Sequence, residues 1–341
     1  MQKLIRRSLA ASAISLAALT AASAQEAITL KLAHPLPNTH YAYENGIKKF
    51  TEAVTAKSGG KVKFEVYPAS QLGKDNYSVV NSGIANIAMI VTSYAPDKFP
   101  LTSVTELPTL FSTSCEAMAK YWSLSKPGGI LEAREYKPLG LKVLMVSTLP
   151  QYNFTTASKP VKTLADVAGL KIFANGAAMD KTARALGAVP VRLTASELFD
   201  AASRGTVDGA VFPYSSLAAY KLEGYIKHSA EGAQLGSASW MLAMSDKGWR
   251  ALPEDVKQAI GDAGLEVQNS LCKYMDDDDG ATRRRLESEK GLSVTKLSPD
   301  EIKLWHEKLA PVATDWAKEM DSKGKPGTAV IEALRAAGSS Q

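Results

Sequence analysis

Two neighbouring stretches decide the fold: residues 160–176 read PVKTLADVAGLKIFANG, and residues 183–213 read ARALGAVPVRLTASELFDAASRGTVDGAVFP. Short β-branched or apolar runs alternate in them with runs of helical spacing. The pattern predicts, in chain order, a strand at 169–173, a helix at 178–186, a strand at 189–193, a helix at 196–203 and a strand at 207–212. Strands that alternate with helices favour largely parallel sheets covered by helices, so the predicted fold class is α/β.

The same rhythm extends on both sides of this region. Before it, strands are predicted at 28–33, 61–67, 87–91 and 141–146, with a helix at 41–57 that ends at Gly59-Gly60. After it, we expect a strand at 237–244, a long helix opened by Pro253, and helices at 299–320 and 329–337. No internal repeat or low-complexity linker separates these segments, so we expect two α/β lobes between which the chain crosses several times.

The first 24 residues have the three parts of a secretory signal peptide. Lys3, Arg6 and Arg7 form a basic start, residues 9–19 form an apolar run, and Ala22-Ser23-Ala24 is a small-residue cleavage site. The apolar run is too short to cross a bilayer, and no later segment is long and apolar enough to do so. We therefore expect cleavage after Ala24, export to the periplasm and no direct insertion into the membrane.

The composition, 45% hydrophobic and 22% charged, is typical of a globular protein. The formal net charge of +5 includes three charges of the predicted signal peptide, so nucleic acid is not an expected partner. The sequence has no phosphate-binding loop, dinucleotide fingerprint or nucleophile elbow, and we expect no cofactor and no enzyme activity. The histidines lack zinc-ligand spacing and are interpreted as loop or surface residues, although His34 and His40 flank a loop where α/β sheets bind ligands.

Two local features leave alternatives open. Cys115 and Cys272 can pair in an oxidising compartment, but two buried free thiols are the preferred interpretation. The acidic run at 276–279 lacks the ligand spacing of a calcium loop, so no metal site is expected. Because Asp279 precedes Arg283 by four residues, we expect the acidic run to pair with arginines on a helix surface.

Short motifs over nearly the whole chain resemble the solute-binding component of tripartite ATP-independent periplasmic (TRAP) transporters, the DctP-type family. The matching pieces include 59–62 (GGKV), 67–73 (YPASQLG), 107–111 (LPTLF), 169–172 (GLKI), 186–188 (LGA), 205–209 (GTVDG) and 252–256 (LPEDV). The resemblance implies a two-lobe binding protein with a ligand cleft, a long helix crossing both lobes, and delivery of its solute to membrane permease subunits. On this basis we expect a monomer in which residues 25–149 and about 237–277 form lobe I, and 150–236 and about 278–341 form lobe II.

The chain departs from that family at the position that binds the ligand. Members typically carry an arginine directly after the Gly-Leu-Lys-Ile stretch, where its planar fork holds a substrate carboxylate, and this chain has Phe173. The predicted ligand site is therefore rich in aromatic and amide side chains: Phe173, Tyr152, Asn153, Asn175, Phe212, Tyr214, Trp240, Tyr94, His34 and Gln71. Such a cleft suits an apolar or aromatic solute, an organic cation over ring faces, or a neutral polar solute. A carboxylate stays open as an alternative, held by Arg192, Lys171, Arg184 or backbone N–H groups at a helix start.

Two other functions fit the same scaffold. One is an exported receptor domain that senses a ligand and feeds a signalling partner. The other, less favoured, is an exported enzyme, which needs a general base beside a nucleophile or a metal. Adjacent permease genes favour transport, whereas turnover of a tested solute favours an enzyme.

Overall fold

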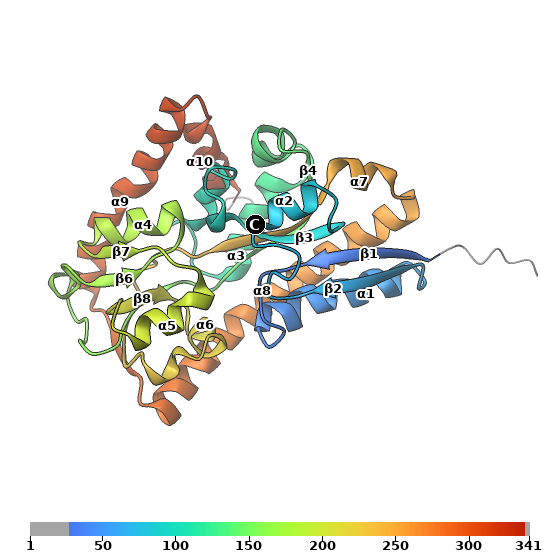
Figure 1. The fold of residues 1–341 in the computed structure, drawn as a ribbon. Helices are drawn as coiled ribbons and strands as arrows, with labels where there is room; N and C mark the ends of the chain where they lie inside the picture. Colours follow the sequence, from blue (N-terminus) through green and yellow to red (C-terminus); the bar gives the residue numbers. More distant parts are fainter. Residues whose placement is uncertain (1–26, 338–341) are drawn as a thin grey trace, which may run out of the picture.

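Two separate β-sheets organise the chain, with helices packed around both (Figure 1). The computed structural model describes residues 27–337, so the predicted signal peptide lies outside the described residues. Helix α8 (Glu254–Lys290) runs along the two sheets from one half of the molecule to the other (Figure 1). The predicted α/β fold class is confirmed.

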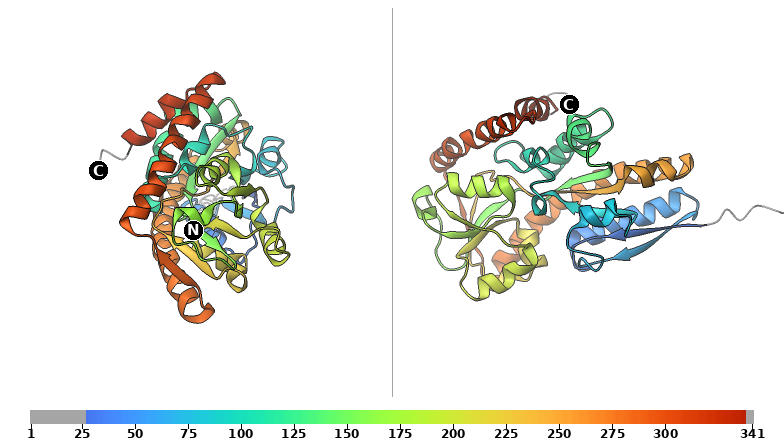
Figure 2. Two further views of the ribbon diagram at one scale, coloured as in Figure 1. Left: turned by 90° about the vertical axis from the view of Figure 1, so that its left-hand side faces the viewer. Right: turned by 45° about the horizontal axis from the view of Figure 1, so that its top comes forward.

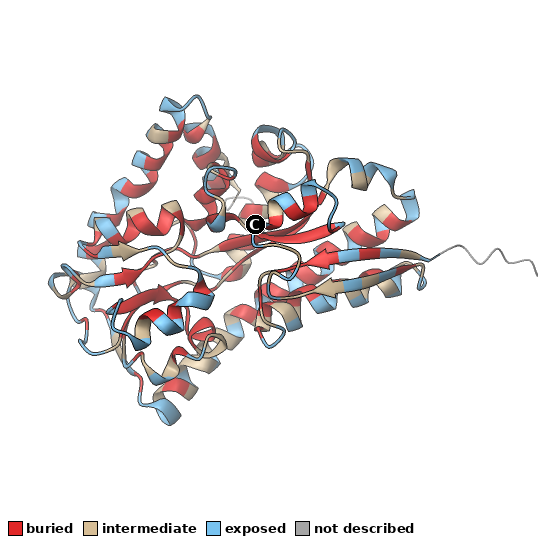
Figure 3. Cartoon of the chain, viewed as in Figure 1, coloured by how far each residue is buried: buried red, intermediate tan, exposed pale blue. Residues whose placement is uncertain are grey.

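Five strands form the first sheet, in the spatial order β2-β1-β3-β10-β4. They are β1 (Ile28–Ala33), β2 (Val62–Tyr67), β3 (Ile87–Val91), β4 (Leu141–Thr148) and β10 (Ser239–Ser245). β1 lies parallel to β2 and β3, whereas β10 runs antiparallel between β3 and β4. The adjacent strands β3, β10 and β4 are almost continuously buried, and Figure 3 shows them as the most buried part of this sheet. They are rich in apolar residues because helices pack against them.

Six strands form the second sheet, in the order β11-β9-β5-β8-β6-β7. They are β5 (Asn153–Thr156), β6 (Lys171–Phe173), β7 (Val189–Val191), β8 (Gly209–Phe212), β9 (His228–Glu231) and β11 (Ser293–Lys296). β6 pairs in parallel with β7 and β8, as the alternation in the sequence predicts. β5 is antiparallel to β8 and β9. The strands β5, β9 and β11 are not predicted from the sequence. Each has four residues and, unlike β6, β7 and β8, lies outside the alternation of strands and helices within 160–213.

The helices of the described residues vary greatly in length. They are α1 (Lys49–Lys57), α2 (Asn76–Asn81), α3 (Ser114–Ser125), α4 (Gly176–Ala185), α5 (Leu198–Ser203), α6 (Tyr214–Ala219), α7 (Asp246–Ala251), α8, α9 (Pro299–Ser322) and α10 (Gly327–Ala336). The helix predicted at 41–57 begins as a π-helical turn, η1 (Tyr43–Lys48), and continues as α1. α8 starts after Pro253 and ends at Gly291, whose left-handed φ of 70° suits a glycine cap. Of these helices, α2, α3, α6 and α7 are missing from the sequence prediction.

The chain passes between the sheets where β4 leads into β5 and where β9 leads into β10. The second crossing needs a glycine: Gly236 has φ of 90°, and a Cβ there would lie 2.2 Å from the Glu106 carbonyl oxygen. α8 packs against α1 and β4 beside the first sheet and against α6 beside the second. Figure 2 shows it alongside both halves, while α9 and α10 lie on another side of the molecule. The crossing strands and α8 therefore join the two halves.

Cys115 and Cys272 form a disulfide, with their Cα atoms 4.7 Å apart, so the preferred prediction of two free thiols is wrong. The bond joins the first turn of α3 to the middle of α8 across a sequence separation of 157 residues. Only the packing of the two helices brings the sulfurs together, and no local pattern in the sequence reports it.

The arginine pairing predicted for the acidic run is also wrong. Asp276 accepts hydrogen bonds from the backbone N–H groups of Ser114 (2.6 Å) and Cys115 (3.2 Å) at the start of α3. Asp279 accepts from the N–H (2.8 Å) and hydroxyl (3.0 Å) of Ser215 at the start of α6. Each carboxylate thus accepts from backbone N–H groups that have no partner within their own helix, and its negative charge complements the positive end of the helix dipole. The acidic run of α8 anchors one helix beside each sheet.

Candidate functional site

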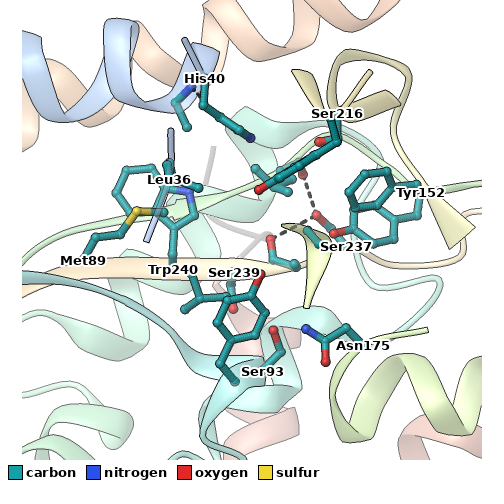
Figure 4. Close-up of a pocket in the computed structure, with 18 of the residues that line it drawn as sticks. Leu36, His40, Met89, Ser93, Tyr152, Asn175, Ser216, Ser237, Ser239 and Trp240 are labelled. Atoms are coloured by element: carbon teal, nitrogen blue, oxygen red, sulfur yellow. Dashed lines mark hydrogen bonds between the residues drawn. The ribbon is translucent and has the colours of Figure 1, made fainter. Parts of the chain in front are cut away.

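A cavity lies where the first sheet faces the second, and segments from both halves enclose it (Figure 4). Its volume of about 50 Å³ exceeds the roughly 10–15 Å³ that one water molecule needs. The lining residues are Leu36, His40, Ala42, Met89, Val91, Ser93, Tyr94, Leu149, Tyr152, Phe173, Asn175, Ala195, Phe212, Ser216, Tyr220, Ser237, Ala238, Ser239 and Trp240. The cavity is therefore a small, mainly apolar and aromatic enclosure between the sheets.

Aromatic rings from the second sheet form one wall of the cavity. Phe173 ends β6 and Phe212 ends the neighbouring strand β8, so both rings lie at the same edge of the sheet. The Phe212 ring meets Phe173 edge-on, with centroids 5.5 Å apart, and Tyr152 edge-on at 5.7 Å. The Tyr220 ring centroid lies 5.9 Å from that of Phe212. These contacts hold the rings in place and present an apolar surface to a ligand.

The first sheet contributes the opposite wall. Trp240 at the start of β10 pairs directly across from Val91 at the end of β3, so both side chains project from one face. Met89 lies two residues before Val91 and shares that face. The indole of Trp240 is 2% exposed, and Figure 4 shows it beside Leu36 and Met89. This wall is also apolar, with the indole as its largest group.

Both loop histidines are buried rather than exposed, which corrects the surface interpretation. His34 is 0% and His40 is 2% exposed. Burial lowers the pKa of each imidazole from 6.5 to about 4, so both rings are neutral near pH 7. His40 lines the cavity, and its Nδ1 accepts a hydrogen bond from the Ala42 N–H at 3.1 Å. A neutral ring that accepts at Nδ1 carries its proton on Nε2, so His40 has one N–H to donate.

A buried carboxyl group lies beneath the cavity. Glu106 is 2% exposed, and its Oε1 accepts from the Ser239 N–H (3.1 Å), the Ser239 hydroxyl (3.2 Å) and the Thr92 hydroxyl (3.2 Å). Ser239 itself lines the cavity. Burial raises the pKa of Glu106 from 4.5 to about 7 despite these donors. A negative charge on Glu106 therefore opposes an anion in the cavity.

A glycine allows α4 to approach the cavity closely. Gly176 opens α4 with φ of 82°, and a Cβ on it would lie 2.6 Å from the Ser93 Cβ. Ser93 and Asn175 lie side by side at this end of the cavity (Figure 4). The Ser93 hydroxyl is buried and has no hydrogen-bond partner among the described residues. This end of the site thus offers polar groups without charge.

The arginines that the sequence offers for a carboxylate lie outside the cavity. Arg192 borders an outer opening that shares Ser93, Tyr94 and Asn175 with the cavity, and its side chain is 67% exposed. It pairs with Asp180 at 3.1 Å, and Arg184 pairs with the same carboxylate at 2.7 Å. No lysine or arginine lines the cavity itself within residues 27–337.

Six of the ten side chains predicted for the ligand site line the cavity: Phe173, Tyr152, Asn175, Phe212, Trp240 and Tyr94. The other four do not. Asn153 and Tyr214 border a second opening beside the acidic run of α8, His34 is buried against Tyr43, and Gln71 is exposed on a loop.

Sequence reasoning missed several lining residues because they come from segments far apart in the chain. They include Leu36, Met89, Ser93, Ser216, Tyr220 and Ser239. His40 carried a signal, since it stands in the loop that follows the first strand, yet it was not placed in the predicted site.

Comparison with known proteins identifies the family. The family described as bacterial extracellular solute-binding protein, family 7 (DctP), matches residues 32–319. The chain belongs to this family. Over 268 residues it is 28% identical to a solute-binding protein of Albidiferax ferrireducens, covering 76% of this chain and 77% of the relative. It is also 28% identical to the C4-dicarboxylate-binding periplasmic protein DctP of Rhodobacter capsulatus, over 96% of both chains.

Solved structures agree with the family assignment. A TRAP solute-binding protein of Rhodoferax ferrireducens, in complex with copurified benzoate, has a TM-score of 0.84 and 26% identity over 91% of this chain and 97% of that one. A TRAP periplasmic solute-binding protein of Bordetella bronchiseptica with bound mandelate has a TM-score of 0.82 and 25% identity, over 91% and 98%. The chain is therefore a DctP-type periplasmic solute-binding protein of the TRAP class, a family of binding proteins rather than enzymes.

Two further findings concern the described part of the chain. Residues 27–337 contain no group of three or more His, Cys, Asp or Glu side chains arranged to hold a metal ion. None of their helices combines the length and the apolar character that crossing a membrane requires.

Proposed function

We propose that this TRAP solute-binding protein captures a small solute with an apolar, ring-shaped body and delivers it to membrane permease subunits. The observation that carries the proposal is the lining of the cavity, where aromatic rings gather without any lysine or arginine of the described residues. Phe173 stands at the position where the family resemblance places a carboxylate-binding arginine.

The physical reason is the balance between apolar burial and desolvation. Burying apolar surface contributes about 25 cal/mol per Å², so a ring enclosed by Phe173, Phe212 and Tyr152 gains several kcal/mol. A carboxylate moved into the same site loses its hydration and finds no paired cation, which is costly. The lining therefore selects for the apolar body of a solute rather than for a negative charge.

Two relatives supply independent support for a ring-shaped ligand. The Rhodoferax ferrireducens protein holds benzoate and the Bordetella bronchiseptica protein holds mandelate, and both ligands contain a benzene ring. For this chain we propose a ligand that shares the ring but not the carboxylate, because no lysine or arginine of the described residues lines the cavity to pair with a carboxylate.

Capture follows from the position of the cavity. Phe173 and Phe212 belong to the second sheet, while Trp240 and Met89 belong to the first, so a ligand between them contacts both halves. A ligand favours the closed form only through contacts that it makes better there than in the open form. A ligand held by one half gains its contacts with the other half when the two halves close. We propose that the lobes with boundaries near 149, 237 and 278 close in this way, and that the closed form docks on the permease.

Substitution of Phe173 tests the proposal. Isothermal titration of the mature protein with benzyl alcohol, benzoate, benzylamine and a non-aromatic polyol should show binding of ring compounds and none of the polyol. Phe173→Ala should weaken binding of the best ring compound at least tenfold, since about 1.4 kcal/mol of ring contact corresponds to a factor of ten.

Phe154→Ala is the matched control. Phe154 is fully buried in the same sheet but packs against Trp305, away from the cavity. This variant should lose stability, by about 3–5 kcal/mol for a buried phenylalanine, and keep the ligand affinity of the folded protein. Tight binding of the polyol, or equal ligand affinity of Phe173→Ala and the unaltered protein, would refute the proposed site.

A further inference from the structure

One buried donor in the cavity has no acceptor in the protein. The Trp240 indole Nε1–H is buried and forms no hydrogen bond with the described residues. Its six-membered ring packs against Gly46, where an added Cβ would lie only 3.3 Å from the ring. Leu271 lies beside the same glycine, 3.2 Å from that Cβ position. The indole is therefore held firmly, with its N–H at a wall of the cavity.

An N–H that is buried without an acceptor costs free energy, which a ligand atom can recover. Tryptophan is a donor only, so the group that satisfies it must be an acceptor. His40, which lines the cavity near Leu36 and Trp240 in Figure 4, adds a second N–H on its neutral ring. Two neighbouring donors favour an acceptor oxygen on the ligand and disfavour an ammonium group.

The charge around the cavity decides between a neutral and an anionic acceptor. Lysine and arginine are missing from the lining formed by residues 27–337, and Arg184 and Arg192 pair with Asp180 outside it. The buried Glu106 carboxyl accepts hydrogen bonds from Ser239, which does line the cavity. An anion would meet donors without positive charge and a carboxyl group close behind them.

We propose that the ligand presents an uncharged hydrogen-bond acceptor, such as the carbonyl oxygen of an amide or ketone, to the Trp240 N–H. This deepens the proposed function and depends on it, because it names the polar end of the same ring-bearing solute. Trp240 is then the residue that determines specificity for a neutral ligand, while the aromatic rings of both walls hold its body.

A series of probes that share one benzene ring tests the charge preference at pH 8, where a carboxylic acid is ionised. Benzamide carries a neutral carbonyl, benzoate an anion, benzylamine a cation and toluene no polar group. Isothermal titration should show benzamide binding at least tenfold more tightly than each of the other three. Tighter binding of benzoate or benzylamine than of benzamide overturns this inference and leaves the proposed ring site intact. Binding of none of the four overturns the proposed function together with the inference.

Trp240→Phe then tests the residue. The substitution keeps an aromatic ring and removes the N–H, so benzamide affinity should fall about tenfold, the worth of one hydrogen bond, while toluene affinity stays within twofold. Trp305→Phe is the matched control, because the Trp305 Nε1 is also buried without a partner but lies outside the cavity against Phe154. It should leave benzamide affinity unchanged. An equal loss of benzamide and toluene affinity in Trp240→Phe, or none of either, overturns the assigned role.

Discussion

Replacement of Glu106 by glutamine tests the electrostatic account of the site. The carboxyl group is buried, and its Oε1 accepts three hydrogen bonds from Ser239 and Thr92. Glutamine keeps an acceptor oxygen and the same shape but carries no charge, so Glu106→Gln imitates the protonated acid. The substitution therefore separates the cost of the buried charge from the value of the hydrogen bonds.

The magnitude follows from the shift in pKa. Burial raises the pKa of Glu106 from 4.5 to about 7 in the folded protein. The folded state therefore holds the Glu106 proton more tightly than the unfolded state. The stability that this group contributes is fully present below pH 4.5 and is lost as pH rises through 7. At about 1.4 kcal/mol per pKa unit, the fall between pH 5 and pH 8 is about 2–3 kcal/mol.

Urea unfolding followed by tryptophan fluorescence at pH 5, 6, 7 and 8 measures this effect. The free energy of unfolding of Glu106→Gln minus that of the unaltered protein should increase by about 2–3 kcal/mol from pH 5 to pH 8. Glu289→Gln, at an exposed position of α8, should show no such increase because water solvates its charge in both states. A difference for Glu106→Gln that does not change with pH would refute the raised pKa of the carboxyl group under the cavity.

Two further predictions concern the contacts of α8. Replacing Cys115 and Cys272 with serine frees a loop of 157 residues, so the free energy of unfolding should fall by about 3–5 kcal/mol, measured in urea without reductant; equal stability of both proteins contradicts it. Asp276→Ala removes the acceptor for two N–H groups of α3 and should lower the free energy of unfolding by about 1–2 kcal/mol. The control Asp277→Ala, at an exposed neighbouring position, should change it by less than about 0.5 kcal/mol. Equal losses in the two variants would exclude the capping role of Asp276.

Local patterns in the sequence account for most of the fold. The alternation within 160–213 correctly predicts β6, α4, β7, α5 and β8, because short apolar runs and runs of helical spacing follow one another there in a regular order. The end of α1 before Gly59-Gly60 and the start of α8 after Pro253 have the same local origin. β5 and α6 lie outside this alternation and were not predicted. β5 is stabilised by pairing with β8 and β9, and α6 by packing against α8, which are contacts between segments distant in the sequence.

The candidate site divides in the same way. Phe173 and Asn175 could be predicted because the resemblance places the ligand position directly after the Gly-Leu-Lys-Ile stretch, and both line the cavity. Asn153 and Tyr214 were misplaced because they stand one or two residues from lining positions. Asn153 is the first residue of β5 and follows Tyr152 directly, and side chains one step apart in extended backbone point to opposite sides.

The sequence by itself determined the family and the α/β class, and it predicted most of the aromatic residues that line the cavity, since these depend on residue type and local order. Only the tertiary structure decided that Cys115 meets Cys272, that Glu106 lies beneath Ser239, and that the Trp240 N–H has no partner. The physical reason is that the first two contacts join residues more than a hundred positions apart, and that tertiary packing, not the neighbours along the chain, decides whether a buried group such as the Trp240 N–H finds a partner.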